Sequence, residues 1–110
     1  QMVQAILADM YTDLETMRAL TYQLGREILE IPLGEGGRGE IHKRSAAAIL
    51  HAGRASMRIL DNAVQLHGGM GFMRESEVNR LYRSGKVMEI GAGTNQVRQM
   101  IIAGELLKAG

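Results

Sequence analysis

The chain has 110 residues, a formal net charge of +1 and no cysteine. Its near-neutral balance argues against a general nucleic-acid-binding protein, which needs a basic face to neutralise phosphates. Without cysteine there is no disulfide, thiolate zinc site or cysteine nucleophile. No apolar run approaches the roughly 20 residues of a membrane span, and no signal peptide is visible. We therefore expect one domain that is neither membrane-spanning nor secreted.

Residues 2–29 carry apolar side chains at steps of mostly three and four, which is the period of an amphipathic helix. These side chains are Ile6, Met10, Leu14, Met17, Leu24 and Ile28. Pro32 lacks a backbone N–H and restricts the residue before it, so the helix must end before this proline. The glycine-rich segment 34–39 predicts an exposed connector.

A second helix is predicted over 41–66, where alanine and other small residues are dense. Small side chains let neighbouring helices approach closely, and their spread around this helix predicts burial on more than one side. Gly68 and Gly69 follow directly, as glycine commonly does beyond a helix C-terminus. We expect this helix to need further partners, either more chain or other subunits.

Two more helices are predicted, over 75–88 and 95–109, and Thr94 is a suitable N-cap for the second of them. In that last helix we expect these residues to face inward: Val97, Met100, Ile101, Leu106 and Leu107. We expect core packing from four of the methionines: Met10, Met17, Met57 and Met100. No segment shows the alternation of apolar and polar residues that would predict a β-strand instead. The sequence predicts an all-α, up-and-down four-helix bundle.

Two glycine-rich breaks, 65–72 and 89–98, interrupt these helices. Glycine permits positive φ angles and lets a ligand approach the backbone closely. A helix that begins after such a break directs free N–H groups at it, which suits an anion such as a phosphate. Taken singly, short glycine patterns of this kind are weak signals.

The other polar residues allow competing interpretations. The histidines His42, His51 and His67 lack metal-ligand spacing, so no metal site is expected. His67 adjoins Gly68, either as a donor to a ligand or as an ordinary turn residue. A basic strip is formed by Arg74, Arg80, Arg83 and Lys86. It is either a phosphate or acidic-partner site or a solvated helix face.

Taken in order and with their spacing, three segments resemble the C-terminal helical domain of the acyl-CoA dehydrogenases. Segment 65–72, QLHGGMGF, looks like Q-x-x-G-G-x-G-[YF]. Segments 79–83 and 93–96 look like E-R-x-x-R-D and the G-T-x-[EQ] of E-G-T-x-[EQ]-[IV]. Gln1 and 8–10 are similar to H-Q-x-x-x-x-x-L-A-[ED]-M, so the resemblance covers 1–110 as one domain whose first bundle helix lies outside this chain.

The resemblance implies a flavoenzyme with FAD as cofactor that oxidises an acyl-CoA to the 2,3-enoyl-CoA. In this family a carboxylate takes the α-proton, FAD N5 takes the β-hydride, and an electron-transferring flavoprotein reoxidises the flavin. Members assemble as homotetramers or dimers. The resemblance therefore implies a homo-oligomer in the bacterial cytoplasm or the mitochondrial matrix.

The family also implies which residues contact the flavin. By motif match, the residues that reach the FAD of a neighbouring subunit are Gln65, Leu66, His67, Gly68 and Gly69. Those that contact the FAD of their own active site are Gly93, Thr94 and Gln96. Gln1 matches a further flavin-contacting glutamine.

The chain departs from the family pattern at two positions. Many members carry the catalytic base directly before Gly-Thr, where this chain has Ala92, which cannot take a proton. Gly-Ala-Gly-Thr resembles the isovaleryl-CoA dehydrogenase branch, whose base is a glutamate on an earlier helix. We expect no catalytic residue within this chain, and we do not assign Glu89 as the base. Ser84 follows Arg83 where Arg-Asp is usual.

Other functions stay open. The same fold serves acyl-CoA oxidases and flavin monooxygenases, which pass electrons to O₂, and a monooxygenase needs no α-proton base. A non-catalytic helical assembly module is a third alternative. Because the family places its flavin-holding domain upstream, we expect residues 1–110 alone to bind no FAD stoichiometrically and to have no dehydrogenase activity.

Overall fold

The computed structural model describes residues 1–32, 34 and 39–109, with the backbone alone at 109. Within these residues all regular structure is helical, which confirms the predicted all-α fold. The helices are α1 (Met2–Leu29), α2 (Glu40–His67), α3 (Gly69–Phe72), α4 (Glu77–Gly85), α5 (Val87–Ile90) and α6 (Asn95–Ala109). Most of the predicted connector at 34–39 lies outside the described residues.

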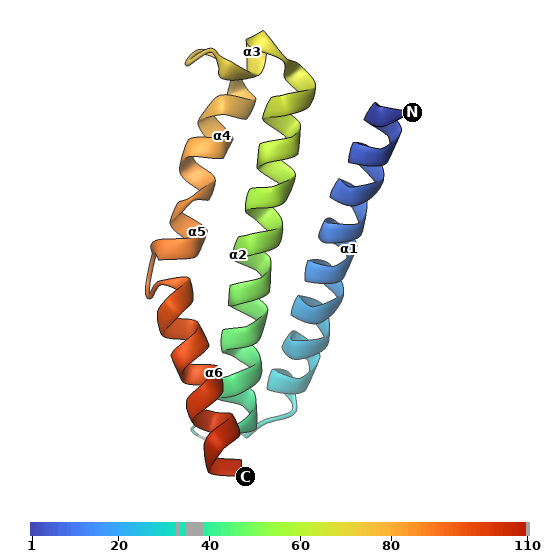
Figure 1. Ribbon diagram of the computed structural model, residues 1–110. Coiled ribbons are helices and arrows are strands. Elements are labelled where there is room, and N and C mark those ends of the chain that lie inside the picture. The colour runs from blue at the N-terminus through green and yellow to red at the C-terminus, as the bar shows by residue number, and fades with distance from the viewer. Residues whose placement is uncertain (33, 35–38, 110) are drawn as a thin grey trace.

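The α2 helix is the central element (Figure 1). It runs antiparallel to α1 on one side and to the column of α4, α5 and α6 on the other. Each of these helices packs on α2, whereas α1 shares an extended contact only with α2 in the part of the chain described. The up-and-down order is as predicted.

Small residues bring these helices close, as the composition of α2 predicts. Ala46, Ala48 and Ala55 are buried. A Cβ at Gly53 would lie 3.0 Å from the carbonyl oxygen of Met88, so α5 packs directly on the backbone of α2. The core is therefore made mainly of alanine and glycine contacts, which require closely spaced helix axes.

The prediction of one continuous helix over 75–88 is wrong, because the structure divides it. Ser76 is the N-cap of α4, and its hydroxyl accepts a hydrogen bond from the N–H of Asn79 at 3.2 Å. The α4 helix then ends at Gly85 and α5 begins at Val87. A Cβ at Gly85 would lie 2.3 Å from Leu60 Cδ1, so a larger residue at this position would clash with α2. Glycine avoids the clash, but it has a low helix propensity, and α4 ends there.

The predicted inward face of α6 is largely wrong within this chain. Ile101 is half-buried, but Met100 is 73% exposed and Leu107 is 82% exposed. Val97 and Leu106 are also exposed. The buried side chains at the start of α6 are the polar Asn95 and Arg98, which hydrogen bond toward α5 and the preceding turn.

Large apolar side chains are exposed on several elements. Examples are Leu29 on α1, Met70 and Phe72 on α3, and Met100 and Leu107 on α6. Met10, Met17 and Met57 are half-buried. No helix in the described ranges combines the length and apolar character of a membrane span. Extensive exposed apolar surface often marks an interaction site. The further partners expected for this bundle remain a prediction.

Candidate functional site

The first glycine turn joins α2 to α3 at one end of the bundle (Figure 1). Gly68 ends α2 with a φ of 62°, a conformation that favours glycine, and its N–H donates to the carbonyl of Gln65 at 3.1 Å. Gly71 is buried, and a Cβ there would lie 2.5 Å from the carbonyl oxygen of Val64. The turn therefore folds tightly onto the last turn of α2.

The α4 helix holds this turn from the other side. Asn79 donates through Nδ2 to the carbonyl oxygens of Gly71 at 3.1 Å and Phe72 at 3.3 Å. Asn79 is the first residue of the motif at 79–83, and its side chain thus hydrogen bonds to the backbone of the first glycine-rich segment. This link makes the two motifs one structural unit.

Four of the five predicted contacts in the first turn are exposed, and Leu66 is half-buried. The exposed residues are Gln65, His67, Gly68 and Gly69. His67 Nδ1 lies 2.7 Å from the carbonyl oxygen of Ala63, which can only accept, so Nδ1 carries the hydrogen. In the neutral ring Nε2 is then an acceptor, and it donates to a ligand only when the imidazole is protonated.

The second glycine turn connects α5 to α6. The N–H of Gly91 donates to the carbonyl of Val87 at 2.6 Å, and two residues of positive φ follow: Ala92 at 56° and Gly93 at 117°. Ala92 is the one non-glycine residue with positive φ among the described residues. The left-handed region disfavours an L residue by about 1–2 kcal/mol.

Thr94 is the N-cap of α6, as predicted. Its Oγ1 accepts a hydrogen bond from the N–H of Val97 at 3.2 Å. The hydroxyl hydrogen remains available to donate, because this contact uses only the oxygen lone pair. Gln96 is exposed beside it. The turn therefore offers hydrogen-bond donors at the N-terminus of a 15-residue helix and no carboxylate at Ala92.

The nearest carboxylate in this segment, Glu89, has both oxygens engaged. Oε1 lies 3.0 Å from Lys86 Nζ, and Oε2 accepts a hydrogen bond from Asn95 Nδ2 at 2.6 Å. The hydrogen bond from Lys86 lowers the pKa of Glu89. Burial opposes it, and the hydrogen bond from Asn95 lowers the pKa further, so the net shift is downward. These contacts support leaving Glu89 unassigned as a base.

Two of the four residues of the basic strip are neutralised by carboxylates, and a third hydrogen bonds to a neighbouring amide. Arg80 forms an ion pair with Glu77, and Lys86 forms one with Glu89. Arg83 donates through Nε to Asn79 Oδ1 at 2.9 Å. This pairing favours the solvated-face interpretation over a phosphate site.

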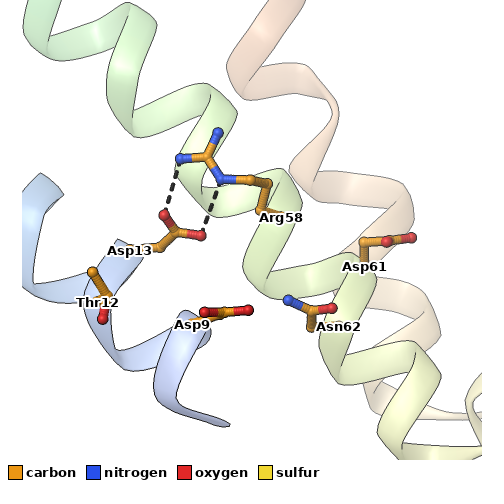
Figure 2. Close-up of a pocket in the computed structure, with 6 residues that line it drawn as sticks. All are labelled: Asp9, Thr12, Asp13, Arg58, Asp61 and Asn62. Atoms are coloured by element: carbon orange, nitrogen blue, oxygen red, sulfur yellow. Dashed lines mark hydrogen bonds and ion pairs between the residues drawn. The ribbon is translucent and has the colours of Figure 1, made fainter. Parts of the chain in front are cut away.

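A polar hollow of about 380 Å³ lies between α1 and α2 (Figure 2). Its lining residues are Asp9, Thr12, Asp13, Arg58, Asp61 and Asn62. Arg58 donates to both carboxylate oxygens of Asp13, at 3.0 Å each, and this contact joins α1 to α2. No predicted site residue lies in this hollow, and among its lining residues Asp13 and Arg58 link the two helices.

The structure separates the predicted contacts into two groups. Segment 65–69 lies at the end of the bundle where the N-terminus, Gln1, also lies, whereas segment 93–96 lies between α5 and α6 (Figure 1). The α4 and α5 helices run between the two turns. Two buried residues beside the second turn, Asn95 and Arg98, were missed by sequence reasoning, because a polar residue in an amphipathic helix gives no signal of burial.

Residues 1–107 match the family described as "Acyl-CoA dehydrogenase, C-terminal domain". Mitochondrial isovaleryl-CoA dehydrogenase of Oryza sativa subsp. japonica is 38% identical over 108 residues, which are 98% of this chain and 25% of that protein. Cyclohexane-1-carbonyl-CoA dehydrogenase of Geobacter metallireducens is 35% identical over 108 residues, 98% of this chain and 27% of that protein. Caffeyl-CoA reductase-Etf complex subunit CarC of Acetobacterium woodii is 35% identical over the same shares.

The chain belongs to the acyl-CoA dehydrogenase family, and it corresponds to the C-terminal helical domain. The relatives are oxidoreductases that act on acyl-CoA compounds, as their names state. The chain spans about a quarter of the length of these relatives.

Proposed function

We propose that this chain is the C-terminal part of an FAD-dependent acyl-CoA dehydrogenase that oxidises an acyl-CoA to the 2,3-enoyl-CoA. The observation that supports this best is the family match over residues 1–107, together with two formed glycine turns at the family's flavin-contacting motifs. A helical assembly module would need neither turn to expose donors.

The chemistry of both turns fits a flavin nucleotide. The first turn offers the exposed glycine backbone at 68 and 69 and the amide of Gln65. The second offers the free hydroxyl hydrogen of Thr94, the amide of Gln96 and the first N–H groups of α6. When bound, FAD supplies the acceptor for the substrate's hydride, and these residues hold and orient it.

Because the two groups lie apart, we propose that they serve two flavins in a homo-oligomer, a dimer or tetramer. The first turn and Gln1 would contact the FAD of a neighbouring subunit. The second turn would contact the FAD of its own subunit. Assigning the two turns to different flavins requires no movement of α4 or α5, the helices that separate the turns.

The α-proton base lies outside this chain in our proposal. Ala92 has no ionisable group, and Glu89 is held by Lys86 and Asn95. The absence of a side-chain carboxylate at Ala92 leaves room beside the second turn. A hollow of about 200 Å³ there is bordered by Gly93, Ile49 and Ile101 among others.

The electron partner and compartment follow from the relatives. One relative is named as a subunit of a reductase-Etf complex, so we propose an electron-transferring flavoprotein as the acceptor. Relatives named mitochondrial and relatives from bacteria both occur, so we propose the mitochondrial matrix or the bacterial cytoplasm.

The relatives also support a second candidate, the reverse reaction. The complex subunit from Acetobacterium woodii is named a caffeyl-CoA reductase, so reduction of an enoyl-CoA by the same fold is a real alternative.

The proposal is tested with the full-length protein that contains this chain. Anaerobic addition of saturated acyl-CoAs, straight and branched, should bleach the flavin absorbance without O₂. Under air, a dehydrogenase should consume little O₂, and it should turn over only when an artificial electron acceptor is present to reoxidise the flavin. Rapid O₂ consumption would favour an oxidase. Reoxidation of the reduced flavin by enoyl-CoA, with no bleaching of the oxidised flavin by any saturated acyl-CoA, would favour a reductase. A purified full-length protein without flavin would contradict the proposal.

A further inference from the structure

Arg98 lies one turn into α6 and is only 7% exposed. Its Nη2 donates to the carbonyl oxygen of Gly91 at 2.9 Å, and its Nη1 to that of Met88 at 3.4 Å. Within the described ranges no carboxylate forms an ion pair with it. Buried arginines are usually paired with acids, so the direction of this guanidinium toward two backbone carbonyls is informative.

Those two carbonyls belong to the end of α5 and to the residue after it. A helix leaves its last C=O groups without intrahelical partners, and α5 is only four residues long. Water has little access to Met88 from the side of α2, because a Cβ at Gly53 would already lie 3.0 Å from that oxygen. Arg98 therefore provides the donor that the end of α5 needs.

A second link spans the same turn. Asn95, the first residue of α6, donates to Glu89 of α5 at 2.6 Å and is also 7% exposed. Arg98 and Asn95 thus connect α6 to α5 across residues 91–94. Ala92, with its φ of 56°, lies inside this bridge. A strained backbone conformation persists only where its surroundings hold it.

We propose that Arg98 is a positioning residue that clamps the turn 91–94 and so fixes Gly93 and Thr94 in the conformation that faces the flavin. The inference rests on the proposed function. Both terminal nitrogens of Arg98 donate to backbone carbonyl oxygens, those of Met88 and Gly91, so we assign this residue the role of holding the turn. The strain at Ala92 is the reason that the turn needs a clamp.

The test uses the full-length protein and a double-mutant cycle of Arg98→Met and Ala92→Gly, read as the Kd of the apoprotein for FAD. Arg98→Met should raise the Kd at least tenfold, and Ala92→Gly alone should change it less than twofold. The double variant should recover most of the affinity, because glycine adopts a positive φ without strain and so needs no clamp to reach it. Arg98→Lys should lie between wild type and Arg98→Met. Arg18→Met, at an exposed position on α1, is the matched control and should have no effect.

A general loss of stability would make the two changes additive, without rescue by Ala92→Gly. Additive effects, or wild-type affinity in Arg98→Met, would overturn the proposal. Hydrogen exchange in the flavin-free protein gives an independent result. Arg98→Met should speed exchange in segment 89–97 at least tenfold and leave α1 unchanged. If the wild-type protein takes up no FAD, the proposed function fails. Hydrogen exchange alone then tests whether Arg98 holds the turn. Unchanged exchange in that segment would reject it.

Discussion

At the scale of single residues, the contact between Asp13 and Arg58 shows how charge links α1 to α2. The hydrogen bonds from Arg58 hold the pKa of Asp13 below its usual range, and partial burial opposes them. The side chain of Asp13 is 18% exposed and that of Arg58 is 52% exposed, so solvent screens the pair. A bidentate pair of this exposure contributes about 1 kcal/mol.

This pair predicts a pH-dependent coupling. Because the folded pKa of Asp13 is lowered, the stabilisation is full above the unfolded pKa and is lost as the pH falls through the folded one. A cycle of Asp13→Asn and Arg58→Gln, read by thermal unfolding, should give a coupling of about 1 kcal/mol at neutral pH. The coupling should weaken as the pH falls below the ordinary pKa of an aspartate, and it should be lost once the pH is below the lowered pKa of Asp13. Asp9→Asn in place of Asp13→Asn is the control and should show none.

Close packing at Gly71 predicts a large effect from a small change. Gly71→Ala places a Cβ 2.5 Å from a backbone oxygen of α2, so the turn must shift. The free energy of unfolding should fall by about 1–3 kcal/mol. Gly69→Ala is the matched control, because its Cβ meets nothing within 4 Å and its φ is not positive. Equal melting temperatures for the two variants would contradict the packing described here.

At the scale of elements, the helices were predictable where a local signal marked both the face and the end. The α1 helix has the predicted bounds of 2–29, and Thr94 caps α6. The division of 75–88 and the exposed apolar face of α6 were not predictable. Both depend on what packs against the helix, and the periodicity of one helix does not specify its neighbour.

The N-cap of α4 gives a prediction for one element. Ser76→Ala removes the acceptor for the N–H of Asn79 and should cost about 1 kcal/mol. The amides at the start of α4 should exchange faster, which hydrogen exchange measures directly. Ser76→Asp keeps an acceptor and should stay close to wild type. Equal exchange in the alanine and aspartate variants would show that the cap has no role.

At the scale of the whole molecule, motif order identified the family, but the arrangement of the site came from the fold. The sequence alone located both glycine turns. It gave no sign of the bridge formed by Asn95 and Arg98, because that bridge joins α6 to carbonyl and carboxylate groups of α5. Side chains that act on a distant backbone leave no periodic pattern.

The exposed apolar surface predicts how the isolated chain behaves. Residues 1–110 alone should bind a hydrophobic dye such as ANS and associate as the concentration rises, because Phe72, Met100 and Leu107 are largely exposed. The full-length protein should bind far less dye per chain. Dye fluorescence and sedimentation velocity measure both quantities. A monomeric, dye-free isolated chain would mean that this surface needs no partner.

The central claim is that the two turns serve flavins of different subunits, and subunit mixing tests it most directly. In the full-length protein, Gly69→Asp places a carboxylate in the first turn, where a Cβ has open space. Thr94→Asp does so in the second and keeps an N-capping residue. Each variant alone should lose FAD.

Co-expressed with different tags and purified as mixed oligomers, the two variants should regain flavin. A subunit with an intact second turn then receives an intact first turn from its partner, so each mixed pair has one complete site. Flavin absorbance per subunit in the mixed oligomers is the measurement. Recovered flavin and acyl-CoA bleaching in the mixture would agree with this account, and mixed oligomers as empty as the single variants would contradict it.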